Sequence, residues 1–331
     1  MNLPDSKPVM RTRSCDPCAL CGARGLVMYR DLEDRFFSAP GQWQLVRCPA
    51  ADCGLVWLNP MPIEADLGLA YRTYFTHEGE KPDRLRRWFL AAYALANAIP
   101  SALAGLTRAK RQMDVLYLDG LAPGRLLDVG CGDGRFLHEM NQQGWRGEGV
   151  DFDPQAVERA RQQYGLTVHA GSLAEAGYGE NVFDAVTLRH VIEHVPDAPG
   201  LLRECRRLLK PKGRLVVVTP NMNSLGHRRF GQNWMNLDPP RHLHLFSCRT
   251  LVRCARLAGF EKVQGLTTAA NADVIFAVSL ALDQRARHPL GTSARPELGR
   301  SLKAVGWQYR EFWRLRLDPE AGEEAVLVAT K

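Results

Sequence analysis

The sequence predicts an α/β protein built on a doubly wound, seven-stranded sheet, with a small cysteine-rich module before it and extra helices around it. One observation behind this prediction is the regular alternation of short apolar and amphipathic stretches from residue 120 onward. The other is the segment 125–137, where a buried strand turns directly into a helix through Gly130, Gly132 and Gly134. Such sheets bind ligands at the carboxyl ends of their strands, so we expect the functional site there.

The expected elements follow in order along the chain. Residues 1–14 are expected to be disordered, 15–62 to form a zinc-ribbon-like module, 63–119 to be helical and 120–331 to form the main domain. The strands of that domain are expected at 125–130, 147–151, 166–170, 183–189, 214–219, 261–268 and 325–330. Helices are expected at 133–143, 154–164, 198–209 and 248–258, because Pro154 suits a first helical turn and Gly259 a helix end.

Composition favours a globular protein of the cytoplasm. The chain has 331 residues, 45% hydrophobic and 24% charged, which is enough for one large core and a smaller module. The formal net charge of +7 is scattered along the chain and indicates a solvated basic surface in preference to a nucleic-acid-binding run. We expect no secretory signal, and nine cysteines in such a chain favour a reducing compartment and metal-binding thiols.

The glycine-rich turn indicates the kind of ligand that it binds. Dinucleotide-binding turns have a third glycine where this chain has Arg135, and the Gly-Lys-Ser/Thr ending of a P-loop is absent. Instead Asp128 precedes the glycines and suits a cationic amino group, while Asp151 ends the next strand and can accept both ribose hydroxyls. An adenosine with a cationic tail and no phosphate describes S-adenosylmethionine (SAM).

With these residues the chain resembles the class I SAM-dependent methyltransferases. The resemblance implies a Rossmann-like sheet with an antiparallel last strand, and contact with the adenine at residues 171–173. It also implies that the fourth strand carries its last residues to the binding edge. We therefore expect the cofactor to contact Asp128, Gly130, Cys131, Gly132, Gly134, Asp151, Phe152, Ser172, Leu173, Arg189 and His190.

The N-terminal cysteines predict a structural, four-thiolate zinc site. Five of the nine lie between positions 15 and 53, in short-spaced pairs typical of such sites. We assign Cys18, Cys21, Cys48 and Cys53 as ligands because a glycine follows Cys21 as another follows Cys53, and Cys15 remains an alternative ligand. Together with the sequence C-G-L-V-x-L-N-P at 53–60, this pattern resembles a bacterial methyltransferase subgroup that includes sugar-modifying enzymes.

Two segments are additions to the basic fold. Residues 88–99 form a mainly apolar stretch after a basic cluster, too short to span a bilayer, which takes ~20 residues. We expect it to pack on the main domain, with peripheral membrane contact as the alternative. Residues 270–322 separate the last two strands and contain an apolar stretch, 274–282, and a basic amphipathic one, 295–317. We expect a helical cap over the substrate site; a dimer interface or a membrane-facing surface is the alternative.

The segment 183–197 carries the candidate catalytic residues, and its F-D-x-V strand followed by E-H-V-x-D resembles many small-molecule methyltransferases. Methyl transfer requires alignment of the acceptor and often removal of its proton. We predict His194 as the base and Glu193 as the residue that orients it; alternatively Glu193 caps backbone amides and His194 only packs. Ubiquinone-pathway O-methyltransferases carry E-x-x-E-H here, associated with a divalent metal. Mg²⁺ is therefore an alternative, against which His190 at the first position argues.

Two further motifs resemble the family, T-P-N at 219–221 and P-x-H-x-x-x-F at 240–246. The resemblance implies an acceptor pocket lined by Asn221, Trp234, Arg241 and His242. The alternative for His242 is a structural bond to a loop carbonyl.

The leading functional hypothesis is a SAM-dependent methyltransferase that acts on a small molecule or sugar, on oxygen before carbon or nitrogen. The second is an RNA or protein methyltransferase that uses the zinc module for recognition. Enzymes that methylate amino groups of nucleic acids have Asn/Asp-Pro-Pro-aromatic where this chain has Leu-Arg-His-Val at 188–191, which argues against that class. The third is a non-catalytic SAM-binding zinc scaffold, but the intact glycines, Asp128 and Asp151 argue against lost cofactor binding.

Overall fold

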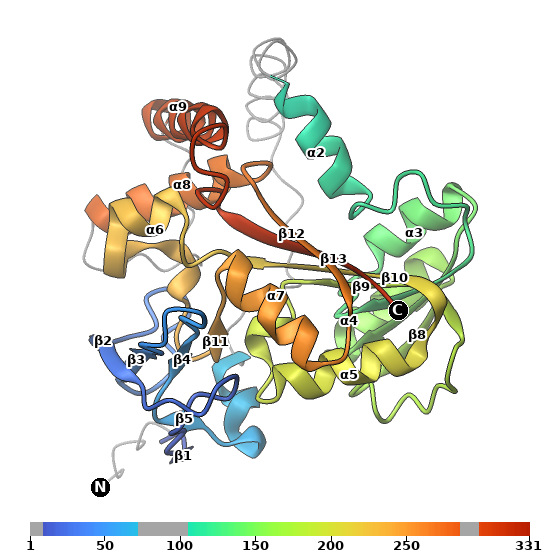
Figure 1. The fold of residues 1–331 in the computed structure, drawn as a ribbon, viewed down its shortest axis with the longest axis horizontal. Coiled ribbons are helices and arrows are strands. Elements are labelled where there is room, and N and C mark those ends of the chain that lie inside the picture. Colours follow the sequence, from blue (N-terminus) through green and yellow to red (C-terminus); the bar gives the residue numbers. More distant parts are fainter. Residues whose placement is uncertain (1–8, 72–104, 285–297) are drawn as a thin grey trace, which may run out of the picture.

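The fold is centred on a seven-stranded sheet in the order β12-β13-β10-β9-β6-β7-β8 (Figure 1). It is taken from a computed structural model that describes residues 9–71, 105–284 and 298–331. β13 runs antiparallel to both of its neighbours, as predicted, while β10, β9, β6, β7 and β8 pair in parallel. The strands are β6 Arg125–Val129, β7 Arg146–Asp151, β8 Thr167–Ala170, β9 Phe183–Arg189, β10 Leu209–Pro220, β12 Lys262–Thr268 and β13 Glu324–Thr330.

Helices cover both faces of this sheet, which confirms the doubly wound α/β prediction. They are α2 Leu106–Asp114, α3 Arg135–Gln142, α4 Pro154–Tyr164, α5 Ala198–Leu208 and α7 Cys248–Leu257. Neighbouring residues of one strand enter different cores: Leu126 packs with α3 and α4, while Leu127 packs with α5 and α7. The starts of α4, α5 and α7 are fixed by side-chain caps from Asp153, Asp197 and Ser247.

The cysteine module, blue in Figure 1, is the segment from residue 15 to 62, and its sheet has the order β11-β4-β3-β2. Its strands are β2 Leu26–Leu32, β3 Trp43–Arg47 and β4 Val56–Leu58, while β5 Met61–Pro62 pairs with β1 Thr12–Arg13. The fourth strand of the sheet, β11 His244–Leu245, comes from the main domain. The predicted boundary at residue 62 is therefore a boundary in the sequence and not a separation of cores.

Two of the predicted segments before the main domain can be compared with the structure. The expectation of disorder through residue 14 is wrong for its last part, because Thr12 and Arg13 pair with Met61 and Pro62. Of the predicted helical segment 63–119, the structure has a 3-10 helix, Glu64–Tyr71, and α2. The basic cluster and the apolar stretch 88–99 lie outside the described residues.

The segment between the last two strands is helical where it is described. The apolar stretch lies in α8 Ala272–Gln284 and the amphipathic stretch in α9 Leu298–Arg314. α8 packs on α9, on α6 Leu225–Phe230 and on the short 3-10 helices that follow α6, at Gly231–Asn233 and Met235–Leu237. Among the helices of the described ranges, none is both long and apolar enough to cross a lipid bilayer.

Candidate active site and cysteine cluster

The glycine turn after β6 has one position that opens toward a ligand. Gly130, Gly132 and Gly134 all have positive φ, at +74°, +55° and +78°. A Cβ on Gly130 would lie 2.3 Å from Val191, and one on Gly134 would lie 2.5 Å from Leu166, so both glycines permit close packing. A Cβ on Gly132 would meet no described atom within 4 Å. Gly132 is therefore the position at which the backbone can meet a cofactor.

Two carboxylates flank this turn from neighbouring strands. Asp128 is 5% exposed and accepts a hydrogen bond of 2.6 Å from the Thr187 hydroxyl. Burial raises the pKa of Asp128 to about 7, against the opposing effects of Thr187 and the Arg189 charge. Asp151 accepts the backbone N–H groups of Gly132 at 2.7 Å and Asp153 at 2.9 Å, so it also fixes the glycine turn.

The remaining predicted cofactor contacts divide into two groups. Phe152, 72% exposed, and Ser172, whose hydroxyl donates to Glu175, follow the ends of β7 and β8 at the binding edge. Cys131 and Leu173 are buried, and Cys131 packs so closely that a Cβ on Gly149 would lie 2.5 Å from its sulfur. The side chains of Cys131 and Leu173 therefore belong to the core, and only their backbones are available to a cofactor.

His190 is a fixed link between three segments. Its backbone has φ +54°, and its ring nitrogens lie 3.2 Å from a Glu193 oxygen and 3.0 Å from a Glu324 oxygen. Burial acts to lower the pKa of His190, but the bonds to Glu193 and Glu324 outweigh it and raise the pKa to about 10. His190 is thus a bound cation, which cannot act as a general base.

Glu193 does not orient His194, so that part of the sequence prediction is wrong. Its two oxygens bind His190 and the Thr219 hydroxyl, the latter at 2.9 Å, and the side chain is fully buried. Burial acts to raise the pKa of Glu193, but the His190 bond lowers it to about 2. The physical reason is the 3-10 turn Ile192–His194, in which consecutive side chains point about 120° apart.

His194 is oriented by a backbone carbonyl instead. Its Nδ1 lies 3.0 Å from the Arg241 oxygen and 3.0 Å from the Tyr71 hydroxyl. Because the Arg241 carbonyl can only accept, we place the proton on Nδ1, which leaves the lone pair on Nε2. Burial, followed by the charge of His242, lowers the pKa of His194 to about 4. At neutral pH His194 is therefore an uncharged imidazole with a free acceptor nitrogen.

His242 pairs with His194 at a ring-centroid distance of 4.8 Å. Its Nδ1 lies 2.7 Å from the Asn236 carbonyl, the structural bond that was the alternative for this residue. Ligand atoms of Glu193, His194 and His242 lie within 4.8 Å of one another. Two imidazoles and a carboxylate already engaged by His190 and Thr219 do not fit Mg²⁺, which prefers oxygen ligands in an octahedron.

The other predicted acceptor-pocket residues have structural roles, which corrects the sequence prediction. Asn221 is fully buried and donates to the carbonyls of Glu320 and Gly322, each at 2.7 Å. Trp234, 1% exposed, donates from Nε1 to Glu323 at 2.7 Å. The polar side-chain atoms of Asn221 and Trp234 are hydrogen-bonded to the segment before β13 and are therefore not available to an acceptor.

Arg241 likewise forms a buried clamp and not a substrate contact. It is 1% exposed and pairs with Asp34 of the cysteine module, through both guanidinium nitrogens at 2.8 Å, and with Asp238. Burial acts to lower the pKa of Arg241, but the two carboxylates raise it well above the usual value. Since the carbonyl of the same residue binds His194, this clamp also positions the candidate base.

Three residues of this region were not predicted from the sequence: Asp34, Tyr71 and Glu324. Asp34 and Tyr71 reach the site across more than a hundred positions of sequence, and no local pattern marks such a contact. Glu324 had a signal, because the first residue of an antiparallel last strand must lie at the carboxyl edge of the parallel strands.

The four predicted zinc ligands converge in the structure. Cys18 and Cys53 sulfurs lie 3.7 Å apart, Cys21 and Cys48 sulfurs 3.3 Å apart, and all four lie within 4.8 Å. A tetrahedral zinc with Zn–S bonds of ~2.3 Å requires sulfurs roughly 3.8 Å apart, so the geometry fits. The Cys15 sulfur instead faces the Arg13 carbonyl at 3.7 Å and is not a member of the group.

Backbone amides of the module point at these sulfurs. The backbone amides of Leu20, Ala23 and Leu55 act against the effect of burial on the pKa of Cys18, Cys21 and Cys53. The glycines after the second thiol of each pair, Gly22 and Gly54, have φ of +76° and +70°, which supports the assignment of Cys18 and Cys21 as a pair.

The cluster is attached to the main domain through α7. The hydroxyl of Thr250 donates to the Cys53 carbonyl at 2.7 Å, and Arg249 donates to the Ala51 carbonyl at 3.1 Å. Arg253 donates to the Leu20 carbonyl and pairs with Asp52. The order of the loop 48–53 therefore depends both on its thiols and on α7.

Comparison with known proteins agrees with this geometry. The family described as a methyltransferase domain matches residues 105–265. Ubiquinone biosynthesis O-methyltransferases of Pseudomonas aeruginosa and Pseudomonas fluorescens are 34% identical over 157 residues and 32% over 156. The matched segment spans 44–45% of this chain and 66% of the relatives, just under two thirds of their length.

Solved structures with a similar sheet are more distant. A SAM-dependent methyltransferase of Archaeoglobus fulgidus is 19% identical, covering 69% of this chain and 94% of that one, with a TM-score of 0.46. A Haloferax volcanii methyltransferase in complex with the activator Trm112 is 20% identical, covering 70% and 96%, with a TM-score of 0.46. By its matched segment and its strand order, the main domain of this chain is similar to the class I SAM-dependent methyltransferases.

Proposed function

We propose that this protein transfers a methyl group from SAM to a hydroxyl of a small-molecule or sugar acceptor. The observation that carries the proposal is the edge at which Gly132 opens between Asp128 and Asp151, on the same side of the sheet as His194. The relatives named as O-methyltransferases support oxygen as the methylated atom. Their name says that those relatives act in ubiquinone biosynthesis.

The residues at this edge would have separate roles in cofactor binding and in proton transfer. Bound SAM supplies a methyl group on a sulfonium, ready for in-line displacement. Asp128 would hold the cationic amino group and Asp151 the ribose hydroxyls, with the backbone at Gly132 close to the cofactor. His194 Nε2 would accept the proton of the acceptor hydroxyl, while the Arg241 carbonyl keeps the ring in this tautomer. The buried Glu193 would stabilise the resulting imidazolium by charge and not by a hydrogen bond.

A methyl-transfer screen tests the proposal. The protein would be incubated with SAM labelled in the methyl group and with pools of hydroxylated small molecules and sugars, followed by mass spectrometry. We expect label in one acceptor class and none with heat-denatured protein. Label that appears only in RNA or in protein would support the recognition-module alternative, and no transfer to any pool despite SAM binding would support a non-catalytic scaffold.

We further propose that the four cysteines hold one structural zinc ion per chain. Four thiolates leave no open coordination position for a water, so the metal would stabilise the fold and take no part in chemistry. Elemental analysis should find about one equivalent, which the double variant Cys21→Ser/Cys48→Ser loses and the matched variant Cys15→Ser keeps. Full retention by the double variant, or less than half an equivalent in the native protein, would refute the assignment.

The proposal includes a location and a role for the added helices. We place the protein in the cytoplasm, because a reducing compartment preserves the four thiolates proposed for zinc and the other five cysteines as free thiols. We assign α8 and α9 to a cap over the acceptor side. This assignment is supported by the packing of α8 on the 3-10 helices at 231–237, directly before Asp238 and the Arg241 clamp.

A further inference from the structure

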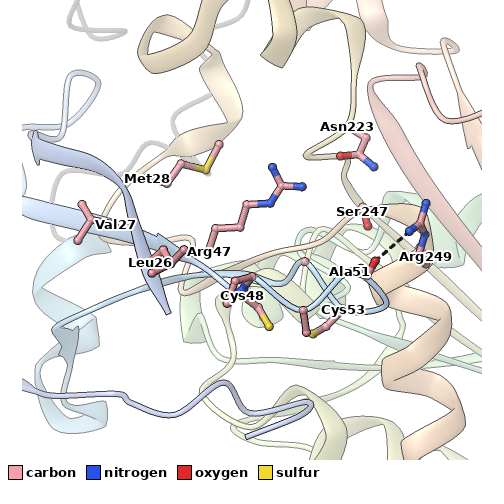
Figure 2. Close-up of a pocket in the computed structure, with 13 residues that line it drawn as sticks. Leu26, Val27, Met28, Arg47, Cys48, Ala51, Cys53, Asn223, Ser247 and Arg249 are labelled. Atoms are coloured by element: carbon pink, nitrogen blue, oxygen red, sulfur yellow. Dashed lines mark hydrogen bonds between the residues drawn. The ribbon is translucent and has the colours of Figure 1, made fainter. Parts of the chain in front are cut away.

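Two adjoining cavities lie where the cysteine module meets the main domain. The larger has a volume of about 460 Å³ and is lined by residues of β2, by the loop 47–54 and by Asn223, Ser247 and Arg249 (Figure 2). The second, about 340 Å³, shares Arg47 and Asn223 with it, so the two form one interdomain cleft. A cleft of this size is within the range of small-molecule sites.

Apart from the cluster thiols Cys48 and Cys53, the charged side chains that line this interdomain cleft are arginines. Arg47 comes from the module, while Arg228 and Arg249 come from the main domain. No Asp or Glu is among the described residues that line either cavity. Arg228 pairs with Asp318 and Arg249 donates to Ala51, whereas the side chain of Arg47 forms no hydrogen bond or ion pair with any other residue in the described part of the chain.

Arg47 does not serve the thiolates of the cysteine cluster. Figure 2 shows its side chain leaving the end of β3 and extending away from Cys48 and Cys53, toward Asn223. The arginine that attends the cluster is Arg253, which binds the Leu20 carbonyl and Asp52. The free guanidinium of Arg47 is therefore available to an anion in the cleft.

The part of the cleft beside Arg47 is apolar. Leu26, at the start of β2, is the cross-strand partner of Arg47 and is 62% exposed (Figure 2). Val27, 43% exposed, and Met28 follow it in β2 and also line the cavity. A ligand that fits has an anionic end for Arg47 and an apolar part for β2.

We propose that the interdomain cleft is a binding site for a small phosphate ester, with its phosphate on Arg47 and its apolar group against Leu26 and Val27. A guanidinium forms two parallel hydrogen bonds with a phosphate, and three arginine heads suit an ion that carries two negative charges. The proposal is independent of methyl transfer, and it assigns a ligand to the module side of the protein.

Calorimetric titration of the zinc-loaded, full-length protein at constant ionic strength tests this site with three probes. We expect phenyl phosphate to bind with a Kd below ~1 mM, more tightly than inorganic phosphate or benzoate. Arg47→Gln should weaken phenyl phosphate binding by about tenfold or more. The matched control is Arg30→Gln, which removes the same charge from an exposed arginine of β2 outside the cleft and should stay within about twofold.

Four results would overturn the proposal. These are no saturable binding of phenyl phosphate, equal weakening by Arg30→Gln, benzoate binding as tight as phenyl phosphate, or loss of zinc in Arg47→Gln alone, which would make Arg47 a partner of the thiolates. If Arg47→Gln does not fold, Val27→Asp provides the second test. Val27→Asp places a negative charge in the apolar part of the cleft and leaves Arg47 unchanged. This substitution should also abolish phenyl phosphate binding.

Discussion

Two regions follow the carboxyl ends of the strands of one sheet but are built in different ways. They are the cofactor edge, formed by Asp128, the glycine turn and Asp151, and the histidine pair, formed by His194 and His242. At the cofactor edge, Asp128, the glycines and Asp151 come from one strand–turn–helix–strand segment, and Asp151 accepts the N–H of Gly132 directly. At the histidine pair, His194 depends on Arg241, which depends on Asp34 of the cysteine module. The first region is readable from local sequence, while the second is assembled from contacts distant in the chain.

This difference makes the histidine side more fragile in function. Substituting one residue of the cofactor edge removes one contact with the cofactor. Substituting one residue of the histidine side alters the position of a base through a chain of partners, some of which lie outside the main domain. The four predictions below test the two regions separately, beginning with the largest expected effect.

His194→Gln should have the largest effect on catalysis. The substitution keeps most of the side-chain volume and removes the acceptor nitrogen, so kcat should fall by about 10²–10⁴-fold. SAM affinity should stay within about twofold, because His194 is not part of the cofactor edge. Steady-state kinetics with the acceptor found by methyl labelling, together with calorimetry for SAM, provide the measurement.

His244→Gln is the matched control for this substitution. His244 is also buried, bonds to a carbonyl through Nδ1 and has its pKa lowered to about 4 by burial. It should affect stability more than kcat. If both variants lose kcat equally, or if His194→Gln keeps activity within a few-fold at every pH, His194 is a packing residue.

Asp34→Asn should have the largest effect on stability. Asp34 and Arg241 are both fully buried at the side chain, and removing the Asp34 charge leaves the buried Arg241 with Asp238 as its remaining carboxylate partner. The free energy of unfolding in urea should fall by roughly 3 kcal/mol. Glu139→Gln removes the charge of the exposed Arg135–Glu139 pair on α3 and should leave unfolding nearly unchanged, so equal effects would contradict the buried clamp.

Asp151→Ala should weaken SAM binding by about ten- to a hundredfold, or ~1.5–3 kcal/mol. Part of this loss comes from the ribose hydroxyls and part from release of the Gly132 amide, which the carboxylate holds at 2.7 Å. Asp133→Ala, one position after Gly132 and outside both contacts, is the control. Calorimetry on the three proteins decides, and unchanged affinity in Asp151→Ala would remove Asp151 from the cofactor site.

The smallest expected effect is a pH dependence of SAM affinity that originates at Asp128. Burial raises the pKa of this carboxyl to about 7, so it is neutral below that pH and attracts a cation only when ionised. Affinity should therefore rise with pH, by about tenfold between pH 6 and pH 8, and then level off. Asp128→Asn should bind weakly and without this slope. An affinity that falls with rising pH would contradict the assignment.

The limits of sequence prediction follow the same division between local and distant contacts. The seven strands of the main sheet, the glycine turn and the four clustered cysteines all have local patterns, and the structure has each of them. The orientation of His194 by Glu193 was wrong because adjacency in sequence does not imply contact within a 3-10 turn. Asn221 and Arg241 were misassigned because their partners, Glu320 and Asp34, lie far away in the sequence.

Calorimetric titration of the native protein with SAM and, separately, with NAD tests the central claim most directly. We expect one SAM per chain, bound at least about tenfold more tightly than NAD, because Asp128 attracts a cationic tail and repels a pyrophosphate. Tighter binding of NAD than of SAM, or no saturable binding of SAM, would contradict it.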